Sequence, residues 1–406
     1  MKLRRILLAL LVGVAACQPA EDTFSPFTVT VSNPLNIDRE AAFVHIPVRE
    51  LPADFLPGAF VVKNGDQEIP SQFIKKGKAG LAFVVDLDAE EEKQFTVSYS
   101  SKPTTYPKKT QAEISVKTGG KFENRKYIGG DFKNIDSLKV PDEHTDHSYY
   151  IRYEGPGWES DKVGYRFYLD WRNATDVFGK TTNEPVLQQV GLDGFDSYHE
   201  MQDWGMDVLK VGKSLGIGSV ASFVDSVAQR VAETDSVICK IEENGAIYSS
   251  FETTYFGWKI HDQSVKLTSD ISIHAGTRLT RQKLHIDQSI DNLCTGINKI
   301  EGTEIFRTIG SKNHYGYIAT YGAQSLNGDN LGMVVFFHPL QFARFDEDEN
   351  SHIVVLQPHV GDLEYYFAAA WELEPNGITT AEEFDAYIRQ MAAQLAQPVN
   401  VKIEKS

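Results

Sequence analysis

The chain has 406 residues, and Asp and Glu outnumber Lys and Arg by 56 to 40, which gives a formal net charge of −16. An anionic surface of this kind repels polyanions at long range, so the composition argues against nucleic-acid binding. An anionic substrate would therefore need a local basic patch.

The first residues have the pattern of an export signal. Basic residues within 2–5 precede an apolar run that is too short for a permanent membrane span. The small residues of "VAAC" match a bacterial lipobox, so we expect a signal peptide over 1–16 and a lipid on Cys17. An ordinary signal peptide cleaved after Ala16 is the alternative. With the lipid, a tether over 17–26 attaches the protein to the outer membrane, on its periplasmic or cell-surface side, and makes its only membrane contact.

Segments of alternating hydrophobicity follow the tether and are typical of strands. The series begins with "FTVTVSN" and "AAFVHIPV" and ends with "QFTVSYS", with Pro, Gly and Asn between the segments. A Pro- and Lys-rich stretch at 100–111 indicates a linker or a long loop. We therefore predict an N-terminal β region over 27–110.

Residues 111–406 are also predicted to be mainly β, with strand-like segments such as "SYYIRYEG", "VGYRFYLDW" and "EYYFAAAWELE". Two segments have a helical pattern. One is 197–211, where a glycine weakens the prediction, and the other is 379–396, where Thr380 can cap the helix. The expected fold is a large antiparallel β-sandwich of the supersandwich, mutarotase-like type, with few helices, a C-terminal helix and the catalytic region at 111–406.

Two cysteines follow the signal, Cys239 and Cys294. Export would allow a disulfide between them, and two buried free thiols are equally compatible with the sequence. The sequence contains no CxxC pair, HExxH motif or Walker loop. The spacing of His199, Asp203 and Asp207 does not demand a metal, so we predict an enzyme without metal or cofactor.

Residues 153–180 combine aromatic and charged side chains. Alternation places Tyr165 and Phe167 on a face that can be buried, and Arg166, Asp170 and Arg172 on the other face. Guanidinium groups suit carboxylates or sulfates, and aromatic rings stack on sugars. A ladder of Arg–Asp pairs on a solvated sheet face is the alternative. The predicted substrate-binding residues are Trp158, Arg166, Tyr168, Arg172, Trp204 and Lys210.

Histidine and tyrosine provide candidate groups for proton transfer. On a helix, Asp203 would lie one turn after His199 and orient its imidazole. A second cluster lies in "NHYGYIATYG", and each of its members could equally be structural. Arg278 and Arg281 are weaker candidates for anion binding. The predicted catalytic residues are His199, His314, Tyr315 and Tyr317.

The block from Gly155 to Lys180 and the segment "DWGMDVLKVGKSLGIGS" resemble a family of bacterial lipoproteins of formerly unknown function. Members of that family are encoded beside enzymes that degrade uronate-containing polysaccharides, and its characterised branch is the ulvan oligosaccharide dehydratase. The resemblance covers most of the chain after the signal. It implies that water is lost across C4 and C5 of a non-reducing-end glucuronate or iduronate, leaving a 4,5-unsaturated uronate. The implied partner is an anionic oligosaccharide, with or without sulfate.

Such an elimination requires three groups. A cation on the carboxylate stabilises the enolate-like intermediate, a base removes the C5 proton, and an acid protonates the departing hydroxyl. A polysaccharide lyase needs the same groups. A mutarotase- or epimerase-like enzyme and a non-catalytic glycan-binding lipoprotein are also compatible with the sequence.

Overall fold

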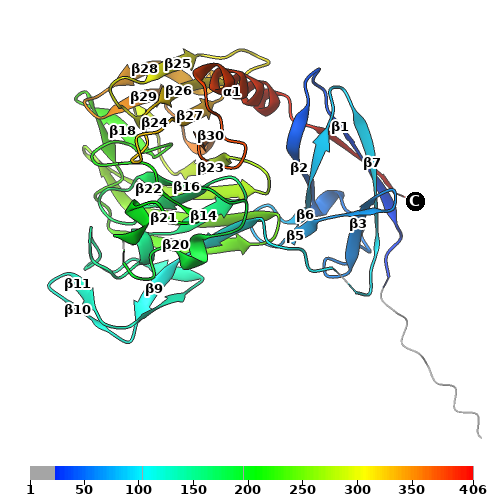
Figure 1. Ribbon diagram of the computed structural model, residues 1–406, viewed down its shortest axis with the longest axis horizontal. Coiled ribbons are helices and arrows are strands. Elements are labelled where there is room, and N and C mark those ends of the chain that lie inside the picture. Colours follow the sequence, from blue (N-terminus) through cyan, green and yellow to red (C-terminus); the bar gives the residue numbers. More distant parts are fainter. Residues whose placement is uncertain (1–22, 103, 195, 406) are drawn as a thin grey trace, which may run out of the picture.

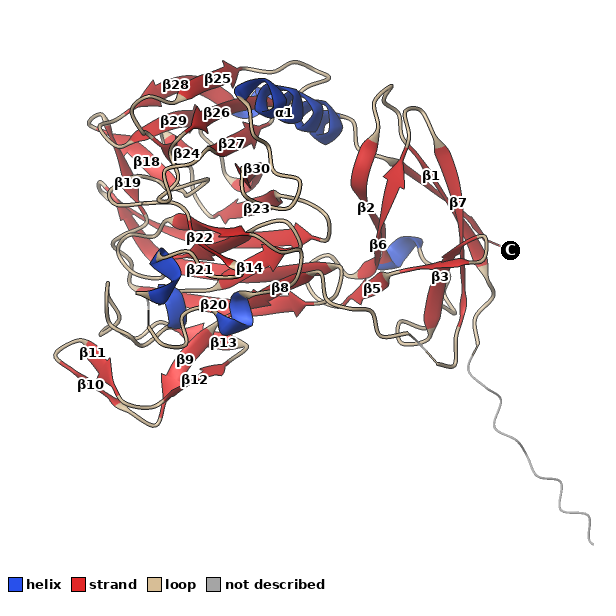
Figure 2. Cartoon of the chain, in the orientation of Figure 1, coloured by secondary structure: helices blue, strands red, loops and turns tan. Residues whose placement is uncertain are grey.

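The computed structural model describes residues 23–102, 104–194 and 196–405 (Figure 1). The expected signal peptide and the lipid site Cys17 lie outside the described residues. Antiparallel strands are the main secondary structure of the described chain, and helices are few (Figure 2). The prediction of a mainly β fold is confirmed. None of the described helices is long and apolar enough to cross a membrane.

Two small sheets form an N-terminal sandwich, drawn in Figure 1 in blue except for its C-terminal strand, which is red. Their inner faces share one apolar core, to which Val29, Phe83 and Phe95 contribute. The first sheet contains, in spatial order, β31 (Asn400–Lys405), β1 (Phe27–Ser32), β7 (Glu92–Tyr99), β3 (Phe60–Asn64) and β4 (Gln67–Ile69). The second contains β2 (Arg39–Pro47), β6 (Gly80–Leu87) and β5 (Ser71–Ile74).

The C-terminal strand belongs to this N-terminal sandwich. β31 pairs antiparallel with β1, with Val401 opposite Val31 and Ile403 opposite Val29. The sequence pattern had grouped residues 400–405 with the large region, because a single strand gives no sign of a partner nearly 400 residues away. Both ends of the described chain are therefore held in one small sandwich (Figure 1).

A nine-stranded antiparallel sheet forms one layer of the large region. Its strands, in spatial order, are β13 (Ser137–Lys139), β20 (Ser236–Asn244), β21 (Tyr248–Ile260), β22 (Gln263–His274), β23 (Leu279–Ile286), β30 (Gly361–Trp371), β27 (Leu331–Phe337), β26 (Gly316–Gly322) and β25 (Glu304–Thr308). Alternate residues point inward: on β23, Leu284 joins the core while Arg281 and Lys283 point outward. The period-2 pattern thus gives this sheet one apolar and one polar face.

Two five-stranded sheets form the opposing layer, and their apolar faces share one core with the nine-stranded sheet. One contains β17 (Gly205–Asp207), β16 (Thr175–Lys180), β15 (Gly164–Phe167), β14 (Gly157–Ser160) and β8 (Thr110–Glu113). The other contains β19 (Val227–Arg230), β18 (Ala221–Val224), β24 (Leu293–Asn298), β29 (Ser351–Leu356) and β28 (Phe342–Glu347). Small pairs join β10 (Lys121–Glu123) to β11 (Lys126–Ile128), and β9 (Ser115–Thr118) to β12 (Asp131–Asn134).

Among the described residues, a single α-helix, α1 (Ala381–Ala396), lies on the outer face of the nine-stranded sheet. Thr380 caps it as the sequence predicted: its side chain accepts the Glu383 backbone N–H at 3.2 Å, and Glu383 accepts the Thr380 backbone N–H at 3.2 Å. Phe384 and Ile388 bury the apolar side of the helix against β26 and β27.

Two local predictions were wrong. Residues 148–155 form no strand but a turn with η2 (Arg152–Glu154), a 3₁₀ turn in which Tyr153 and Glu154 have positive φ. Residues 197–211 form η4 (Ser197–His199), another 3₁₀ turn, followed by β17, and not a helix. Gly205 is the reason: its φ is +125°, and its backbone approaches Gly179 so closely that a Cβ would lie 1.9 Å from the Gly179 oxygen.

The remaining 3₁₀ turns are short: η1 (Val48–Glu50), η3 (Leu187–Gln189) and η5 (Pro339–Gln341). Cys239 on β20 and Cys294 on β24 are both free and buried. Burial raises the pKa of Cys239 to about 12, so its thiol stays protonated at neutral pH. The alternative of two buried free thiols is confirmed.

Candidate functional site

The sheet of β14–β17 carries charged side chains on a face that is nevertheless buried. One face enters the core through Trp158 and Tyr165. Apolar side chains of 186–204 cover the other face and pack on Phe178. Every residue of β14, β15 and β16 is therefore buried. Charges in such a layer are tolerated when they are paired, as Lys180 is with Glu159 at 2.8 Å.

Arg166 lies in this layer with its donors occupied. Its Nε and Nη2 donate to Asp176 Oδ2 at 3.0 and 2.7 Å, and Nη2 also donates to Asp207 Oδ2 at 2.5 Å. Its Nη1 donates to the hydroxyl of Tyr198 at 2.7 Å. The alternation that set Arg166 opposite Tyr165 was thus correct, but the polar face is not solvated. Arg166 is engaged by protein groups and acts as the cation that holds two carboxylates.

Arg172 is also occupied by carboxylates. It donates from Nε to Asp170 at 2.9 Å, pairs through Nη1 with Asp146 at 3.0 Å and pairs through Nη2 with Glu154 at 2.9 Å. Its guanidinium lies over the Tyr168 ring, 3.8 Å from the centroid. Burial would raise the pKa of Glu154, but the Arg172 charge holds it at about 2. Arg172 therefore fixes a turn and is not available to an anionic ligand.

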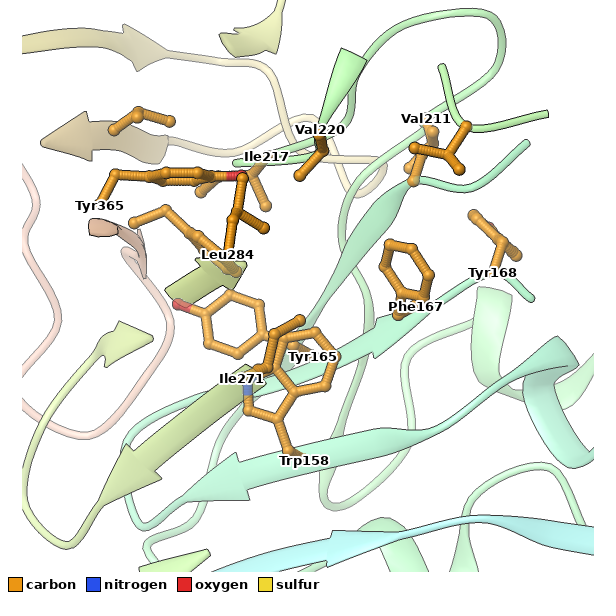
Figure 3. Close-up of a cluster of buried hydrophobic side chains, with 14 of the residues drawn as sticks. Trp158, Tyr165, Phe167, Tyr168, Val211, Ile217, Val220, Ile271, Leu284 and Tyr365 are labelled. Carbon is orange, nitrogen blue, oxygen red and sulfur yellow. The ribbon is translucent and has the colours of Figure 1, made fainter. Parts of the chain in front are cut away.

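The predicted sugar-stacking residues also have other roles. Trp158 is fully buried, stacks on Tyr165 at 5.4 Å and donates to the Thr280 hydroxyl (Figure 3). Tyr168 is buried, and its hydroxyl donates to Asp176. Trp204 packs edge-on against Phe178. Lys210 is exposed, and its backbone carbonyl accepts from Asn298. The rings of Trp158 and Tyr168 are occupied by protein contacts and cannot stack on a sugar in this structure.

His199 finds a carboxylate partner, but not the expected one. Its Nε2 lies 3.3 Å from Asp207 Oδ2, and 42% of the side chain is exposed. Asp203, the partner predicted on a helix, is exposed and contributes its backbone carbonyl to a hydrogen bond from Thr181. The hydrogen bond to Asp207 raises the pKa of His199. His199 thus adjoins a buried cluster in which Arg166 faces two acids.

His314, Tyr315 and Tyr317 lie beside α1 on the outer face of the nine-stranded sheet. The Tyr315 backbone N–H donates to the Ala392 carbonyl at 3.0 Å, and Tyr317 packs beneath the helix. His199 lies on the outer face of the opposing layer, across the core. The four predicted catalytic residues therefore do not form one site.

Asp146, His147 and Glu154 are the one group within the described chain whose ligand atoms are close enough to hold a metal ion. The Arg172 guanidinium already pairs with both of these carboxylates. A cation is therefore present where an ion would bind, and we assign the group a structural role. The three residues considered as metal ligands from the sequence do not form such a group.

A cleft between the N-terminal sandwich and the nine-stranded sheet brings titratable groups together. Its cavity measures about 260 Å³ and is lined from β2, from the loop after β5, from the ends of β21 to β23, from β30 and from α1. Hydrogen bonds hold both ends of the cleft. At one end, Gln72 accepts the Ile247 and Tyr248 backbone N–H groups at 3.0 Å. At the other, Arg39 Nη1 donates to the Gln394 carbonyl of α1.

Two cations line the cleft from opposite walls. Lys78 comes from the N-terminal sandwich, and its ammonium makes no hydrogen bond or ion pair with any residue that the structure describes. Burial lowers the pKa of Lys78 to about 8, and the charge of Arg281 contributes in the same direction. Arg281 comes from β23 and uses Nε and Nη2 on Glu364, which leaves Nη1 without a described partner. Arg281, a weaker candidate from the sequence, thus lies in this cleft.

A tyrosine and a carboxylate complete the charged wall. Tyr366 lies opposite Arg281 in the register of β30 and β23, and its hydroxyl donates to Glu364. Burial raises the pKa of Tyr366, and the Glu364 charge raises it further, so the phenol keeps its proton. Arg281 and Tyr366 both face the cavity. A proton donor and a cation are therefore neighbours on this wall.

Aromatic rings form the adjoining wall. Phe43 stacks on His274 at 5.0 Å and on Tyr248 at 5.6 Å. His274 Nδ1 lies 2.9 Å from the Ala275 carbonyl, and burial lowers the pKa of His274 to about 4, so the ring is neutral at neutral pH. A flat apolar wall beside charged groups is the composition expected of a small-ligand site at a domain boundary.

Lys78, Tyr366 and Glu364 were not among the residues predicted from the sequence. The alternation in "EYYFAAAW" places Glu364 and Tyr366 on one face and Tyr365 and Phe367 on the other, so the polar pair was detectable as an outward-facing row. Lys78, in "KKGKAG", gave no such signal, because the groups that it faces belong to a different sandwich.

Comparison with known proteins places the chain among uncharacterised relatives. The family model of a domain of unknown function, DUF4861, matches residues 31–401. "Uncharacterized protein P7" of Formosa agariphila is 21% identical, and the alignment covers 93% of each chain. Both matches span nearly all of the described chain, so they apply to the two sandwiches together.

Two solved structures from Enterococcus faecalis share a weaker likeness. One is a protein in glycosyl hydrolase family 38, with a TM-score of 0.46 and 10% identity over 95% of this chain. The other is an α-mannosidase, with a TM-score of 0.44 and 9% identity over 93% of this chain. The chain spans about half the length of these proteins, 48% and 46%. Both TM-scores are below 0.5, so these two structures indicate no function for this chain.

Proposed function

Because the chain belongs to the DUF4861 family, a domain of unknown function, its activity must be inferred from its own site, and we propose that it is a glycan-acting hydro-lyase. The substrate is an oligosaccharide, such as one derived from ulvan, with glucuronate or iduronate at its non-reducing end. The enzyme removes water across C4 and C5 and leaves a 4,5-unsaturated uronate. The carrying observation is the desolvated Lys78, without an ion-pair partner among the described residues, facing Arg281 and Tyr366 across the cleft.

Each requirement of the elimination has a candidate group in the cleft. Arg281 Nη1 binds the uronate carboxylate and stabilises the negative charge that develops on it as C5 loses its proton. Lys78, with a pKa of about 8, has an accessible neutral form and takes the C5 proton. Tyr366 remains protonated and donates to the departing 4-hydroxyl. The proton lost from C5 resides on Lys78, and the hydroxyl leaves as water with the proton of Tyr366. Transfer of the proton from Lys78 to the Tyr366 phenolate then restores both groups.

Substitution of Lys78 tests whether its side chain removes the C5 proton or only binds the substrate through its charge. Lys78→Ala and Lys78→Arg are both expected to lower kcat by about 10²–10⁴-fold, since arginine keeps the charge but cannot act as a base near neutral pH. The wild-type kcat/KM is expected to rise with pH and level off above about 8. The assay follows absorbance of the unsaturated product and, by mass spectrometry, the loss of one water with chain length unchanged.

Lys76→Ala is the matched control, because Lys76 lies two residues away, is largely exposed and pairs at the long distance of 3.9 Å with Glu242. If Lys78→Arg turns over like wild type, Lys78 is not the base. Products shortened by a cleaved glycosidic bond would instead identify a polysaccharide lyase. Binding without any product from wild-type protein would indicate a non-catalytic glycan-binding lipoprotein.

A further inference from the structure

A second hollow, of about 580 Å³, lies beside β19, the edge strand of its sheet. It is lined by β19, by the turn between β15 and β16, by the segment around Lys213 and by the tip of the β21–β22 hairpin. Tyr248 of β21 lines the cleft, whereas Trp258, ten residues further along the same strand, lines the hollow. At about 3.3 Å per residue these two residues are about 30 Å apart, so the hollow is separate from the cleft.

Trp171 presents an exposed indole to this hollow. It is the most exposed of the five tryptophans, at 48%, whereas Trp158, Trp258 and Trp371 are at most 1% exposed. Val227 of β19, which is 51% exposed, lines the same hollow. An apolar wall made of an indole and a branched side chain is thus left in water, which is typical of a surface that a ligand covers.

Hydrogen bonds hold the turn that carries Trp171. The Asn173 backbone N–H donates to the Asp170 carbonyl at 3.0 Å. The Asp170 carboxylate accepts from the Arg172 backbone N–H and from Arg172 Nε, both at 2.9 Å. The contacts that make Arg172 unavailable to a ligand therefore fix the backbone on both sides of Trp171. A backbone that is already ordered loses little conformational entropy when the ring binds a ligand.

Arg230 places a positive charge beside the indole. Its guanidinium lies over the Trp171 ring, with the central carbon 5.6 Å from the ring centroid. Its Nη1 donates to the Ser214 carbonyl at 2.9 Å and to the Gly212 carbonyl at 3.4 Å. No carboxylate of the described chain lies within ion-pair distance of this guanidinium, in contrast to Arg281, which pairs with an acid. Nε and Nη2 of Arg230 are therefore without a described partner.

The protein compensates the charge of Arg230 only in part. Burial lowers the pKa of Arg230, whereas the more distant charges of Asp170 and Asp348 raise it. Both of these carboxylates have other partners. Asp170 binds Arg172, and Asp348 accepts backbone N–H groups from residues 228, 350 and 351. A partly desolvated guanidinium without a carboxylate of its own favours an anionic ligand.

Lys213 is a second cation at the same place. Gly212 and Ser214, whose carbonyls bind Arg230, are its neighbours in the chain. Lys213 is exposed, lines the hollow and pairs with no acid of the described chain. Of the two acids that line the hollow, Asp348 is engaged as above and Glu233 is exposed. This wall therefore combines an open aromatic ring with two cations that have no carboxylate partner.

We propose that this hollow is a second sugar-binding site, where Trp171 stacks on a ring of an anionic glycan and Arg230 and Lys213 bind its carboxylate or sulfate. The inference rests on the proposed function for the class of ligand. A guanidinium suits both anions, and an indole supplies a large contact area with few rotatable bonds. Because the hollow is about 30 Å from the cleft, it binds a part of the glycan remote from the terminal uronate. Long chains therefore gain affinity from both sites, and short chains do not.

The first experiment measures binding, independently of turnover. Calorimetric titration compares wild type with Trp171→Ala, using a long oligosaccharide that carries uronate and sulfate but has no uronate at its non-reducing end. We expect the dissociation constant to rise roughly tenfold, as when a central aromatic contact is removed, and Trp171→Phe to retain most of the affinity. Leu340→Ala is the control, because Leu340 is 84% exposed and lines neither the hollow nor the cleft. Equal affinity of wild type and Trp171→Ala, or no binding by wild type, would overturn the proposal.

A second set of titrations identifies the anion. Lys213→Ala is expected to raise the dissociation constant about two- to fivefold, because one exposed charge contact is lost, and Lys312→Ala, an exposed cation outside the hollow, is the control. If desulfation of the oligosaccharide removes this difference, the site binds sulfate. If reduction of the carboxylates removes it instead, the site binds carboxylate. Equal affinity of wild type for the anionic chain and for a chain without either group would overturn the anionic ligand class.

The last experiment follows turnover of uronate-terminated chains of increasing length. For wild type, KM should fall once the chain is long enough to reach the hollow from the cleft, because the second contact then becomes possible. In Trp171→Ala this fall of KM with length should be lost. The same fall in both proteins would contradict simultaneous binding at the two sites. If wild type gives no product from any chain but Trp171→Ala still weakens binding, the proposed function fails while the second sugar-binding site stands.

Discussion

Asp176 and Asp207 share one guanidinium where water is excluded, and this affects the protonation of Asp176. Both bind Nη2 of Arg166, at 2.7 and 2.5 Å, so two negative charges face one fixed positive charge. Burial, and then repulsion from Asp207, raises the pKa of Asp176 to about 7. The hydrogen bond between His199 and Asp207 also raises the pKa of His199, so the acids of the cluster favour proton binding at that imidazole as well. The cluster thus approaches neutrality by holding a proton.

A pH-dependent stability follows from Asp176. Its folded pKa lies above the unfolded value of 3.8, so its contribution is fully present below about pH 4 and is lost as the pH rises through about 7. The free energy of unfolding of wild type should therefore fall over this range by up to about 4 kcal/mol from this group, at about 1.4 kcal/mol per pKa unit. Asp176→Asn should reduce that slope. Urea unfolding at several pH values measures it, and parallel curves for both proteins would contradict the assigned protonation.

At the scale of elements, alternation in the sequence predicted many of the longer strands and the inward and outward faces of β15. The same pattern could not predict that residues 186–204 would cover the outer face of β14–β17. Whether Arg166 binds a ligand or two aspartates depends on that cover, which comes from a segment without regular periodicity. The predicted helix at 197–211 failed because one glycine packs against Gly179 of another strand. Local pattern thus predicted the elements, whereas the partners of charged residues depended on contacts distant in sequence.

Prediction of the cleft from the sequence was limited for the same reason, because its residues belong to elements that are distant in the sequence. Arg281 was identified as a weak anion-binding candidate from its own segment, and the alternation of β30 allows Tyr366 to be found. Lys78 belongs to the other sandwich, and contacts between the two sandwiches, among them those of Gln72 and Arg39, bring it opposite them. A site at a domain boundary therefore remains incomplete when segments are considered one at a time.

At the scale of the whole molecule, lipid attachment at Cys17 stays a prediction. Cys17→Ser should release the protein from membrane fractions into the soluble fraction, because no acyl chain could then be attached. Fractionation followed by immunoblotting measures this, with Cys239→Ser as the control, since Cys239 is a buried thiol far from the signal. A Cys17→Ser protein that still sediments with membranes would contradict lipid anchoring.

The pairing of β31 with β1 joins the last residues of the chain to the first sandwich. Without β31, the first sandwich should unfold at a lower denaturant concentration than the large region. Deletion of 400–406 exposes β1 as an edge and removes Val401 and Ile403, which pack against the N-terminal core. We expect a loss of about 2–4 kcal/mol in that sandwich, since full burial of one such side chain contributes about 1.5–3 kcal/mol. Turnover should fall as well, because Lys78 is held in the cleft by the same sandwich.

The five tryptophans provide a selective probe, because all of them lie between residues 158 and 371, in the large region. Tryptophan fluorescence therefore reports the large region alone, whereas far-ultraviolet circular dichroism reports both sandwiches. In wild type the two unfolding transitions should coincide. In the deletion protein the circular dichroism transition should begin at lower denaturant, while the fluorescence midpoint changes little. A control that lacks only residues 405 and 406 should behave like wild type. If the two transitions still coincide at the wild-type midpoint after deletion of 400–406, β31 does not stabilise the first sandwich.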